Sequence, residues 1–526
     1  MIISSEDIDV SSLTPDVTIV GGGAVGLIAA VYLASRKVKV LVLEAGPLQV
    51  DPDSQLVFES ARSSGRRHLG IYQGRFRALG GTTNFWGGQL VRFDRLVFSP
   101  RDWVSGDAWP IGYDQIEQFY KICESLLDVP PELTDDQKLL QLSRTPNVHL
   151  DANLTYFFSR WLTEKNFRFR FSHLLKSDPN VTVVTGAPVT MLKFDGSRRS
   201  VTSVIVSGPR GPTQVSSRFV VLANGTIEMV RLLQHPTVGE EEAPWSQNPW
   251  LGRGFMDHLE GTVAKITPVD RKLFHQLFDN VFLKGMKLQP RLKLSEELQR
   301  KERLLGAAFH VKFDSQMEEH VQNAKIFVSG LLKGRFSNPK RIIPELWSAA
   351  RVGVPMSWHY IKHQRILSPA GGDIQLRIML EQTPVLSSTL NLTRERDQHG
   401  MYLPELCWRV SSETEIRTIQ KAVGVVKGYF ESRGIAKVDP SKEISGRSPD
   451  LLDSFVDTYH HMGGVRMASS EKDGVVDPTA RVFGSQNLYV MGAATFPVSG
   501  FANPTFTAMA IALRTAEVIR ERVVAQ

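Results

Sequence analysis

A glycine-rich turn between two short apolar segments constrains the fold of this chain more than any other feature. Residues 16–20 alternate into a short buried strand, residues 27–35 are rich in Ala and Leu as a helix would be, and residues 38–43 form a second β-branched strand. The turn at residues 21–26 joins the first strand to the helix. This order predicts a complete βαβ unit and therefore a parallel sheet.

The turn has the spacing GxGxxG, with glycines at Gly21, Gly23 and Gly26. Gly21 allows the tight turn, Gly23 lets the backbone approach a pyrophosphate, and Gly26 lets the helix pack closely on the strand. Ala24 and Val25 lie in this turn, next to the helix N-terminus, whose free backbone N–H groups and positive dipole end favour phosphate. The turn therefore predicts a dinucleotide-binding site.

An acidic residue at the end of the second strand narrows the choice of dinucleotide. The carboxylate of Glu44 can accept both hydroxyls of an adenosine ribose, and it would repel the 2′-phosphate of NADP. Ala45 and Gly46 follow directly, an ending typical of flavoproteins, and no second GxGxxG between a strand and a helix occurs. These features favour FAD over NAD, with electrons that come from an organic substrate.

Composition and charge exclude several other classes of protein. The chain has 526 residues, enough for several domains, and its net charge of +7 is mild for that length. No nucleic-acid motif and no metal-ligand pattern occurs, and the two cysteines, Cys123 and Cys407, cannot build a disulfide framework. The polar N-terminus does not look like a secretory signal, and no apolar run reaches the ~20 residues of a membrane span. We therefore expect a cytoplasmic protein that binds neither metal nor nucleic acid.

The second half of the chain has a different pattern. Residues 307–313 and 374–380 alternate in polarity and predict an antiparallel sheet, and a long final helix is expected from Pro504. Residues 321–364 predict one or two helices. Within them, segment 333–365 is basic and interleaved with aromatic residues. We interpret it as a solvated helical lid, with an interfacial helix or a partner surface as the alternative.

Further motifs, in their order and spacing, resemble the glucose–methanol–choline (GMC) oxidoreductases. Besides the glycine-rich turn, they are residues 77–88 (RALGGTTNFWGG), 109–114 (WPIGYD), 222–228 (LANGTIE), 252–258 (GRGFMDH) and the block 460–514. Within the family, the chain looks most like the bacterial branch of pyranose oxidases and glycoside 3-oxidases.

The resemblance implies an α/β architecture in two parts. A Rossmann-like FAD-binding domain would be built from residues 1–110, 178–262 and 450–526. An α+β substrate-binding domain with an antiparallel sheet would use residues 111–177 and 263–449.

The resemblance also implies how FAD is held. The Leu-Gly-Gly loop at residues 79–81 would lie against the isoalloxazine ring. Some pyranose oxidases attach FAD through a histidine in this loop, but Phe85 stands at that position, so we expect non-covalent FAD. Besides the turn and Glu44, the implied FAD contacts are Ala45, Gly80, Gly81, Thr82, Asn84, Phe85, Trp86, Gly87, Val183, Ala223, Asn224, Gly492, Ala493, Asn503, Pro504 and Thr505.

The segment HHMGGVRM at residues 460–467 resembles the family's His-x-x-Gly-Thr-x-x-Met, with Gly464 in place of threonine. This alignment makes His460 the catalytic base and His461 its neighbour, a candidate for substrate binding. Imidazole has a reference pKa near ~6.5 and suits removal of a hydroxyl proton at neutral pH. The family also implies that Asn503 faces the substrate hydroxyl, and its place before Pro504 fits a helix N-cap as well.

We therefore predict oxidation of an alcohol to a carbonyl by hydride transfer to flavin N5. The expected substrate is a secondary hydroxyl of a sugar or glycoside, with a 2-keto or 3-keto product and with oxygen, a quinone or a redox protein as electron acceptor. The alternatives are a sterol, choline, aryl or aliphatic alcohol, or a flavin-dependent lyase without net oxidation. Arg466, Asp257 and His258 are interpreted as structural.

Overall fold

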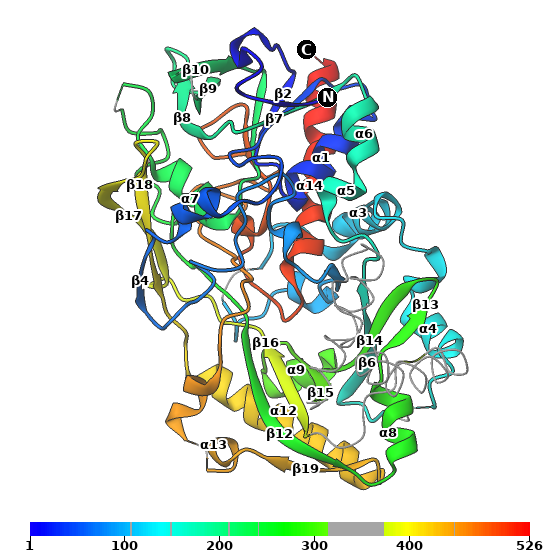
Figure 1. Ribbon diagram of the computed structural model, residues 1–526. Helices are drawn as coiled ribbons and strands as arrows, with labels where there is room; N and C mark the ends of the chain where they lie inside the picture. Colours follow the sequence, from blue (N-terminus) through cyan, green and yellow to red (C-terminus); the bar gives the residue numbers. More distant parts are fainter. Residues whose placement is uncertain are drawn as a thin grey trace, which may run out of the picture.

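Figure 1 shows the computed structural model of the chain. The structure describes residues 1–105, 108–147, 150–208, 211–239, 241–313, 365, 373–446 and 448–525. The helices expected in residues 321–364 lie outside this part, as does the basic aromatic segment 333–365 apart from Arg365.

A parallel sheet of six strands forms the first layer. Its order is β1-β7-β3-β2-β11-β20, and every pair of neighbours is parallel. Most of its strands are runs of Val, Ile and Leu buried on both faces, as parallel sheets require. The strands are β1 (Ile2–Ser4), β2 (Val17–Val20), β3 (Val40–Leu43), β7 (Val181–Thr185), β11 (Phe219–Leu222) and β20 (Leu488–Val490).

The βαβ unit predicted at the N-terminus is confirmed. Helix α1 (Ala24–Ala34) joins β2 to β3, and β3 begins at Val40 rather than at Val38. The final helix α14 (Pro504–Ala525) lies beside α1, so the two ends of the chain meet at this sheet (Figure 1). Strand β1 was not predicted, because its three residues are too few to show a period.

A larger sheet forms the other half of the molecule, in the lower part of Figure 1. Its order is β19-β12-β16-β15-β14-β6-β5, with β13 paired to β14, and all its pairs are antiparallel. The two predicted alternating segments are β15 and β16, which pair with each other. The strands are β5 (Gln89–Leu90), β6 (Leu154–Trp161), β12 (Leu259–Pro268), β13 (Val281–Leu283), β14 (Met286–Leu294), β15 (Ala307–Phe313), β16 (Ile374–Leu380) and β19 (Ala436–Pro440).

Two sheets of three strands complete the described β structure. Their orders are β10-β9-β8 and β17-β18-β4. Their strands are β4 (Arg62–Gly65), β8 (Val189–Phe194), β9 (Val201–Gly208), β10 (Gly211–Ser216), β17 (Thr389–Arg396) and β18 (Tyr402–Trp408). The mixed α/β class with a Rossmann-like part and an antiparallel sheet is therefore as predicted. The division into two domains at the stated boundaries stays a prediction.

The helices not yet named cover the sheets or connect their strands. They are α2 (Pro52–Gln55), α3 (Tyr113–Leu126), α4 (Asp136–Leu142), α5 (Phe167–Arg170), α6 (Ser172–Ser177), α7 (Thr226–Gln234), α8 (Arg271–Phe278), α9 (Glu296–Glu302), α12 (Glu413–Ser432) and α13 (Lys442–Ser445). Short 3-10 turns lie between them at 10–12, 56–58, 81–84, 95–98, 131–133, 449–454 and 493–495. None of the described helices combines the length and the apolar character that crossing a bilayer requires.

Two glycine-to-alanine changes test the packing of the glycine-rich turn. A Cβ on Gly26 would overlap the carbonyl oxygen of Gly21, whereas a Cβ on Gly428, exposed in α12, meets nothing within 4 Å. We expect Gly26→Ala to lower the free energy of unfolding and the bound FAD together. Gly428→Ala should raise the free energy of unfolding by about 0.5–1 kcal/mol, because Gly is a poorer helix former than Ala. Urea unfolding and flavin absorbance measure both; a Gly26→Ala protein with normal FAD content would contradict this account of the turn.

Candidate functional site

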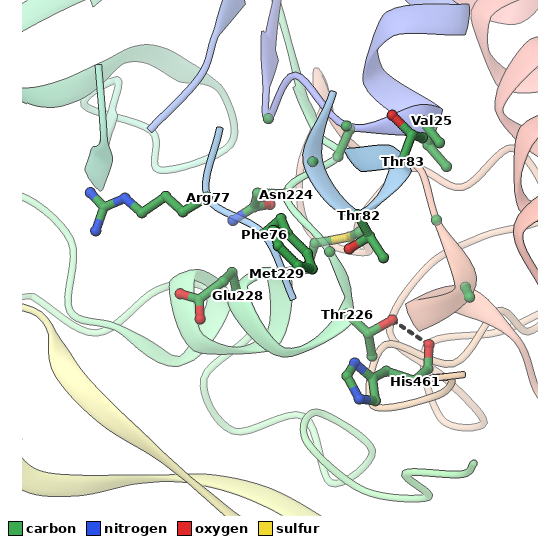
Figure 2. A pocket seen from close by; sticks show the side chains of 18 of the residues that line it. Val25, Phe76, Arg77, Thr82, Thr83, Asn224, Thr226, Glu228, Met229 and His461 are labelled. Carbon is green, nitrogen blue, oxygen red and sulfur yellow. Dashed lines mark hydrogen bonds between the residues drawn. The ribbon is translucent and has the colours of Figure 1, made fainter. Parts of the chain in front are cut away.

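A cavity of about 480 Å³ lies at the carboxyl ends of the parallel strands (Figure 2). This is where ligands bind in open α/β sheets. The predicted site residues that line it are Gly21, Gly23, Ala24, Val25, Glu44, Ala45, Gly81, Thr82, Phe85, Trp86, Gly87, Ala223, Asn224, His460, His461, Gly492, Ala493, Asn503, Pro504 and Thr505. The fold thus brings together segments from both ends and the middle of the sequence.

The glycine-rich turn leaves backbone free to meet a ligand. Gly21 has φ of +104°, and a Cβ there would lie 2.6 Å from the Cα of Asn224. Gly81 has φ of +52°, and its Cβ would lie 2.9 Å from the Cα of Gly23. No side chain caps the N-terminus of α1, so its first N–H groups have no side-chain acceptor, and Ala24 and Val25 line the cavity. These features fit the pyrophosphate of a dinucleotide.

Glu44 lies at the carboxyl end of β3 and is buried. Its carboxylate accepts the N–H of Gly22 and of Gly46, each at 2.8 Å. Burial raises the pKa of Glu44 to about 7, although both of these hydrogen bonds oppose the shift. The carboxylate therefore gains from further donors, such as the two hydroxyls of a ribose.

Four predicted cofactor residues do not line the cavity. Gly26 packs α1 against the turn, and Gly80 has φ of +95° just before the 3-10 turn. The Asn84 amide donates to the carbonyls of Leu79 and Gly81, and Val183 is buried within the sheet. These four residues shape the loop and the sheet, and a direct contact with FAD stays a prediction for each.

Other cavity residues were not singled out from the sequence. Arg77 and Glu228 line it from two different segments (Figure 2), and Pro188, Val189 and Thr190 line it beside β7. Both Arg77 and Glu228 lie inside motifs that carry the family resemblance, so these motifs could have predicted them as cavity residues. The residues at 188–190 carry no motif, and only the pairing of the strands brings them here.

The two predicted catalytic residues meet at one end of the cavity. The Asn503 amide donates through Nδ2 to Nε2 of His460 at 2.9 Å. His460 Nε2 is therefore an acceptor, and its proton lies on Nδ1. The Oδ1 atom of Asn503 is buried and has no hydrogen-bond partner within the described residues. The predicted N-cap bond to α14 is therefore absent, because the side chain turns towards His460 instead.

Nδ1 of His460 is held from the other side. It lies 2.7 Å from Oγ1 of Thr458 and 2.9 Å from Nδ1 of His258. The Thr458 hydroxyl in turn donates to Oδ1 of Asp257 at 3.0 Å. A chain of hydrogen bonds thus runs from His460 through Thr458 to a carboxylate, and it fixes both the ring and its tautomer.

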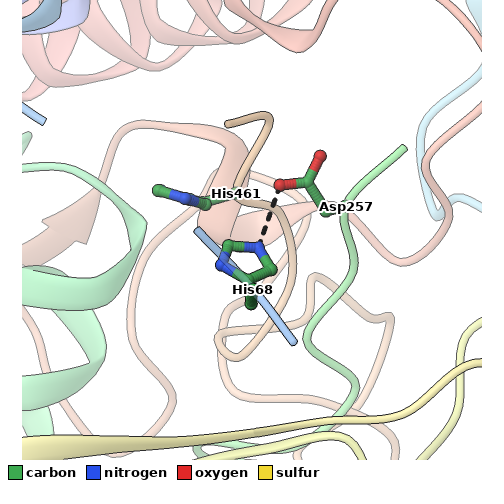
Figure 3. Close-up of side chains that lie close together, drawn as sticks. All are labelled: His68, Asp257 and His461. Atoms are coloured by element: carbon green, nitrogen blue, oxygen red, sulfur yellow. Dashed lines mark hydrogen bonds and ion pairs between the residues drawn. The ribbon is translucent and has the colours of Figure 1, made fainter. Parts of the chain in front are cut away.

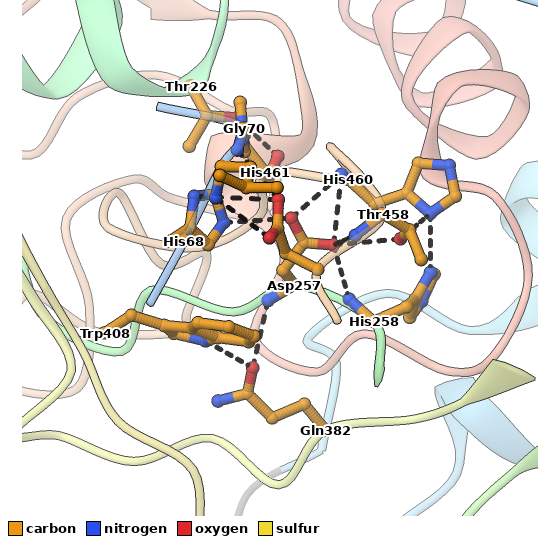
Figure 4. A network of polar contacts seen from close by, with 12 residues as sticks. His68, Gly70, Thr226, Asp257, His258, Gln382, Trp408, Thr458, His460 and His461 are labelled. Atoms are coloured by element: carbon orange, nitrogen blue, oxygen red, sulfur yellow. Dashed lines mark hydrogen bonds and ion pairs between the residues drawn. The ribbon is translucent and has the colours of Figure 1, made fainter. Parts of the chain in front are cut away.

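Asp257 is the centre of this network (Figure 4). Its side chain is fully buried and accepts the backbone N–H groups of His258, Thr458 and His460. His68 Nε2 also donates to it at 3.1 Å. Burial would raise the pKa of Asp257, but the His68 hydrogen bond and the nearby histidines lower it below its usual range. The structural role predicted for Asp257 and His258 is thus a role in holding the base.

The surroundings also change the base itself. Removal from water lowers the pKa of His460 to about 3, and the charges of His258 and Arg291 act in the same direction. The imidazole is therefore neutral at any pH near 7, and it does not titrate near 6.5 as a free histidine would. It can accept a proton without first losing one.

His461 lies on the other side of Asp257 (Figure 3). Its ring is 5.3 Å from that of His68, its Nε2 has no partner within the described part, and its carbonyl accepts the Thr226 hydroxyl. His68, Asp257 and His461 offer ligand atoms within 4.8 Å of one another. The carboxylate already accepts several hydrogen bonds, which favours a polar network over a metal site. Substrate binding by His461 stays a prediction.

Arg466 has the surroundings expected of a structural side chain. It is 8% exposed, and its guanidinium lies over the ring of Trp250 at 4.7 Å. The stacked contact holds the loop after His460 and His461 against residues 248–251.

Comparisons with known proteins agree with this geometry. Residues 384–512 match the family described as GMC oxidoreductase, and residues 19–48 match an NAD(P)-binding Rossmann-like domain. The GMC match includes His460 and Asn503. These matches support the GMC oxidoreductase family. Its members are FAD-dependent oxidoreductases that act on alcohol groups, and the match to the Rossmann-like domain includes the glycine-rich turn and Glu44 of this chain.

Individual relatives are distant. The large subunit of fructose dehydrogenase from Gluconobacter japonicus is 33% identical over 82 residues, 16% of this chain and 15% of that protein. Pyridoxine 4-oxidase from Microbacterium luteolum is 24% identical over 305 residues, 47% of this chain and 58% of that protein. The chain thus covers less than two thirds of either. The crystal structure of pyridoxine 4-oxidase from Mesorbium loti has a TM-score of 0.58 at 16% identity and shares the fold over 96% of this chain and 99% of that one.

The raised pKa of Glu44 leads to a pH-dependent affinity for FAD. If ribose hydroxyls donate to the carboxylate, FAD selects its deprotonated form. Affinity should then be level above about pH 7 and fall as the pH drops and the carboxyl is protonated. Glu44→Gln should bind FAD more weakly and without this pH dependence, as equilibrium titration of flavin fluorescence would show.

Glu415 provides the matched control. Burial also raises its pKa to about 7, but it does not line the cavity. Glu415→Gln should keep the pH dependence of FAD binding. If Glu44→Gln kept it too, Glu44 would not be at the ribose.

Proposed function

We propose that this protein is an FAD-dependent oxidoreductase that removes a hydride from the carbinol carbon of an alcohol. The observation that carries the proposal is the hydrogen bond from the Asn503 amide to Nε2 of His460, at the end of a dinucleotide cavity. It places an unprotonated imidazole nitrogen and an amide side by side at the cavity wall, where a substrate hydroxyl can meet both groups. When bound, FAD supplies the hydride acceptor, N5 of its isoalloxazine ring.

The residues present act on the hydroxyl proton. Nε2 of His460 takes the proton as the C–H bond weakens, and Asn503 donates to the same oxygen. Both side chains then hold the carbonyl product at the same place. The residues around Asp257 keep the base in position throughout.

The Asp257 network supports the charged form of His460. Once Nε2 is protonated, the ring is a cation with its other proton on Nδ1 towards Thr458. The Thr458 hydroxyl lies between this cation and the buried Asp257 carboxylate, and its hydrogen bonds to both let the negative charge of Asp257 stabilise the cation. The arrangement follows the general pattern in which a third group orients and stabilises a catalytic histidine.

FAD is held without a covalent bond in this proposal. Phe85 occupies the loop position at which some relatives carry an attaching histidine. Its ring is 54% exposed and stacks on Phe76 at 5.4 Å. The remaining contacts are the α1 N–H groups, Glu44 and the loop glycines.

For the substrate we keep the secondary hydroxyl of a sugar or glycoside, and the branch of pyranose oxidases and glycoside 3-oxidases. The polar side chain of Gln89 on the cavity wall, which bonds to Ser159, supports a hydroxylated substrate. The second candidate is a non-sugar alcohol. The longer match to pyridoxine 4-oxidase favours it, since that protein is named for pyridoxine. The electron acceptor stays open between oxygen, a quinone and a redox protein.

The decisive experiment mixes the holoenzyme anaerobically with sugars, glycosides and other alcohols and follows flavin absorbance. With the best substrate, His460→Ala should keep FAD but slow flavin reduction by at least ~10²-fold. His461→Ala, which alters the neighbouring ring, should slow it much less. The wild-type rate should not decline on the acid side near pH 6.5, because His460 remains neutral well below that pH. Wild-type reduction rates in His460→Ala would refute the proposal.

A second prediction concerns Thr458. Thr458→Val removes the link between His460 and Asp257, so flavin reduction should slow by about 10-fold or more while FAD content and substrate KM change little. Thr458→Ser keeps the hydroxyl and should restore most of the rate. Equal rates in the Val and Ser variants would show that the hydroxyl has no part in positioning the base.

A further inference from the structure

One face of the antiparallel sheet carries a row of charged side chains. His310 on β15 and Arg377 on β16 are register partners. The pairing of Leu292 with Phe309 places Arg291 on β14 next to His310. Glu260 on β12 completes the row from the far side of β16. The row therefore crosses four neighbouring strands on one face.

Arg291 lacks the partner that a buried cation normally has. It is 5% exposed, yet no carboxylate oxygen of the described residues lies within 4.0 Å of it. Nη2 donates to Oε1 of Gln289 at 3.2 Å, and Nε has no partner. Buried guanidinium groups are usually paired with an anion and fully hydrogen-bonded. Arg291 is thus a cation without its anion.

The rest of the row does not balance this charge. Glu260 lies 3.4 Å from Nε2 of His310 and 3.5 Å from Nη2 of Arg377, so its carboxylate is directed at these two. Burial lowers the pKa of His310 well below its usual value and keeps the ring neutral. Nε of Arg377 and Nδ1 of His310 are also buried without partners. Glu260 is therefore taken up by His310 and Arg377, and it acts on Arg291 only from a longer distance.

The row lies close to the catalytic pair. The charge of Arg291 contributes to the lowered pKa of His460. Phe157, the register partner of Arg291, contacts the ring of Phe501 at 5.9 Å, two residues before Asn503.

The connection to the cavity is made by neighbouring side chains on β5, β6 and β14. Gln89, which lines the cavity, donates to Oγ of Ser159 at 2.7 Å. Ser159 is the register partner of Gln289, the residue that accepts from Arg291. Neighbouring polar side chains therefore connect Gln89 on the cavity wall to Arg291.

We propose that Arg291, assisted by Arg377, binds an anionic group of the substrate, a carboxylate or a phosphate, while the reacting hydroxyl lies at His460. This rests on the proposed oxidation and narrows its substrate class to acidic hydroxyl compounds, such as sugar acids or sugar phosphates. The anion would accept from the unpaired Nε groups and neutralise the excess cation. Glu260 keeps Arg377 directed along the row and limits the positive charge when no substrate is bound.

The kinetic test compares glucose, glucuronate and glucose 6-phosphate in anaerobic flavin reduction by the holoenzyme. At least one anionic compound should exceed glucose in kcat/KM by at least ~10-fold, the effect of a charged hydrogen bond. The two anionic compounds distinguish a carboxylate from a phosphate. Arg291→Met should abolish the preference. Lys312→Met, which removes an exposed cation from the same face of β15, should retain it.

A binding test does not depend on catalysis. Acetate and inorganic phosphate should raise the thermal melting temperature of the wild-type holoenzyme at constant ionic strength, and at least one should fail to raise that of Arg291→Met. If the anions stabilise the wild type in this way but no alcohol reduces the flavin, the proposed oxidation fails and the anion site stands. If glucose and both anionic compounds react equally well and no anion stabilises the protein, the anion site is refuted and the oxidation stands.

The stability of the variant separates binding from structure. Without anion, Arg291→Met should melt at the wild-type temperature or above it, because it removes an unpaired buried charge. Arg291→Lys should keep part of the anion preference. A lower melting temperature or misfolding of Arg291→Met, together with an unchanged substrate preference in Arg291→Lys, would show that Arg291 only supports the sheet and would overturn the proposal.

Discussion

The buried carboxylate of Asp257 is the interaction on which the candidate site depends. It accepts hydrogen bonds from three regions that are far apart in the sequence: the turn after its own residue, the loop of His68, and the loop of Thr458 and His460. A charge in this position is stable only while all these donors are present, because an unpaired buried carboxylate is costly. The segments that build the site are therefore held together by one buried carboxylate. A substitution in any of these segments affects the other segments as well.

The site depends equally on places where side chains are missing. Gly21, Gly23 and Gly81 bring two loops so close that a Cβ on Gly21 or Gly81 would collide with neighbouring backbone. Gly70 leaves room between the rings of His68 and His461 in the same way. Acidic and aromatic groups can thus approach the cavity because glycine provides the space. This explains why glycines, acids and histidines occur together in the motifs of the chain.

Much of the fold could be predicted because its signals are local. The strand, turn and helix at Val17–Ala34 follow from periodicity and from the spacing of three glycines, and the alternation of β15 and β16 is equally direct. The resemblance supplied His460 and Asn503. Thr458 and His68 could not be found, since each has an ordinary local sequence. Each gains its role from a contact with Asp257, which is 189 residues from His68 and 201 residues from Thr458. Arg291 could not be found from the sequence for the same reason. Its lack of a carboxylate partner becomes visible only once the neighbouring strands are in place.

The order of the strands in the parallel sheet affects how the protein is made. Strand β11 pairs with β20, and about 270 residues separate them in the sequence. On a ribosome, β11 is complete long before its neighbour exists, so one side of a hydrophobic strand stays open while the antiparallel sheet is being synthesised. An open strand edge can pair with other chains. Yield in a heterologous host should therefore depend on chaperones and on slow synthesis more strongly than the stability of the finished protein would suggest.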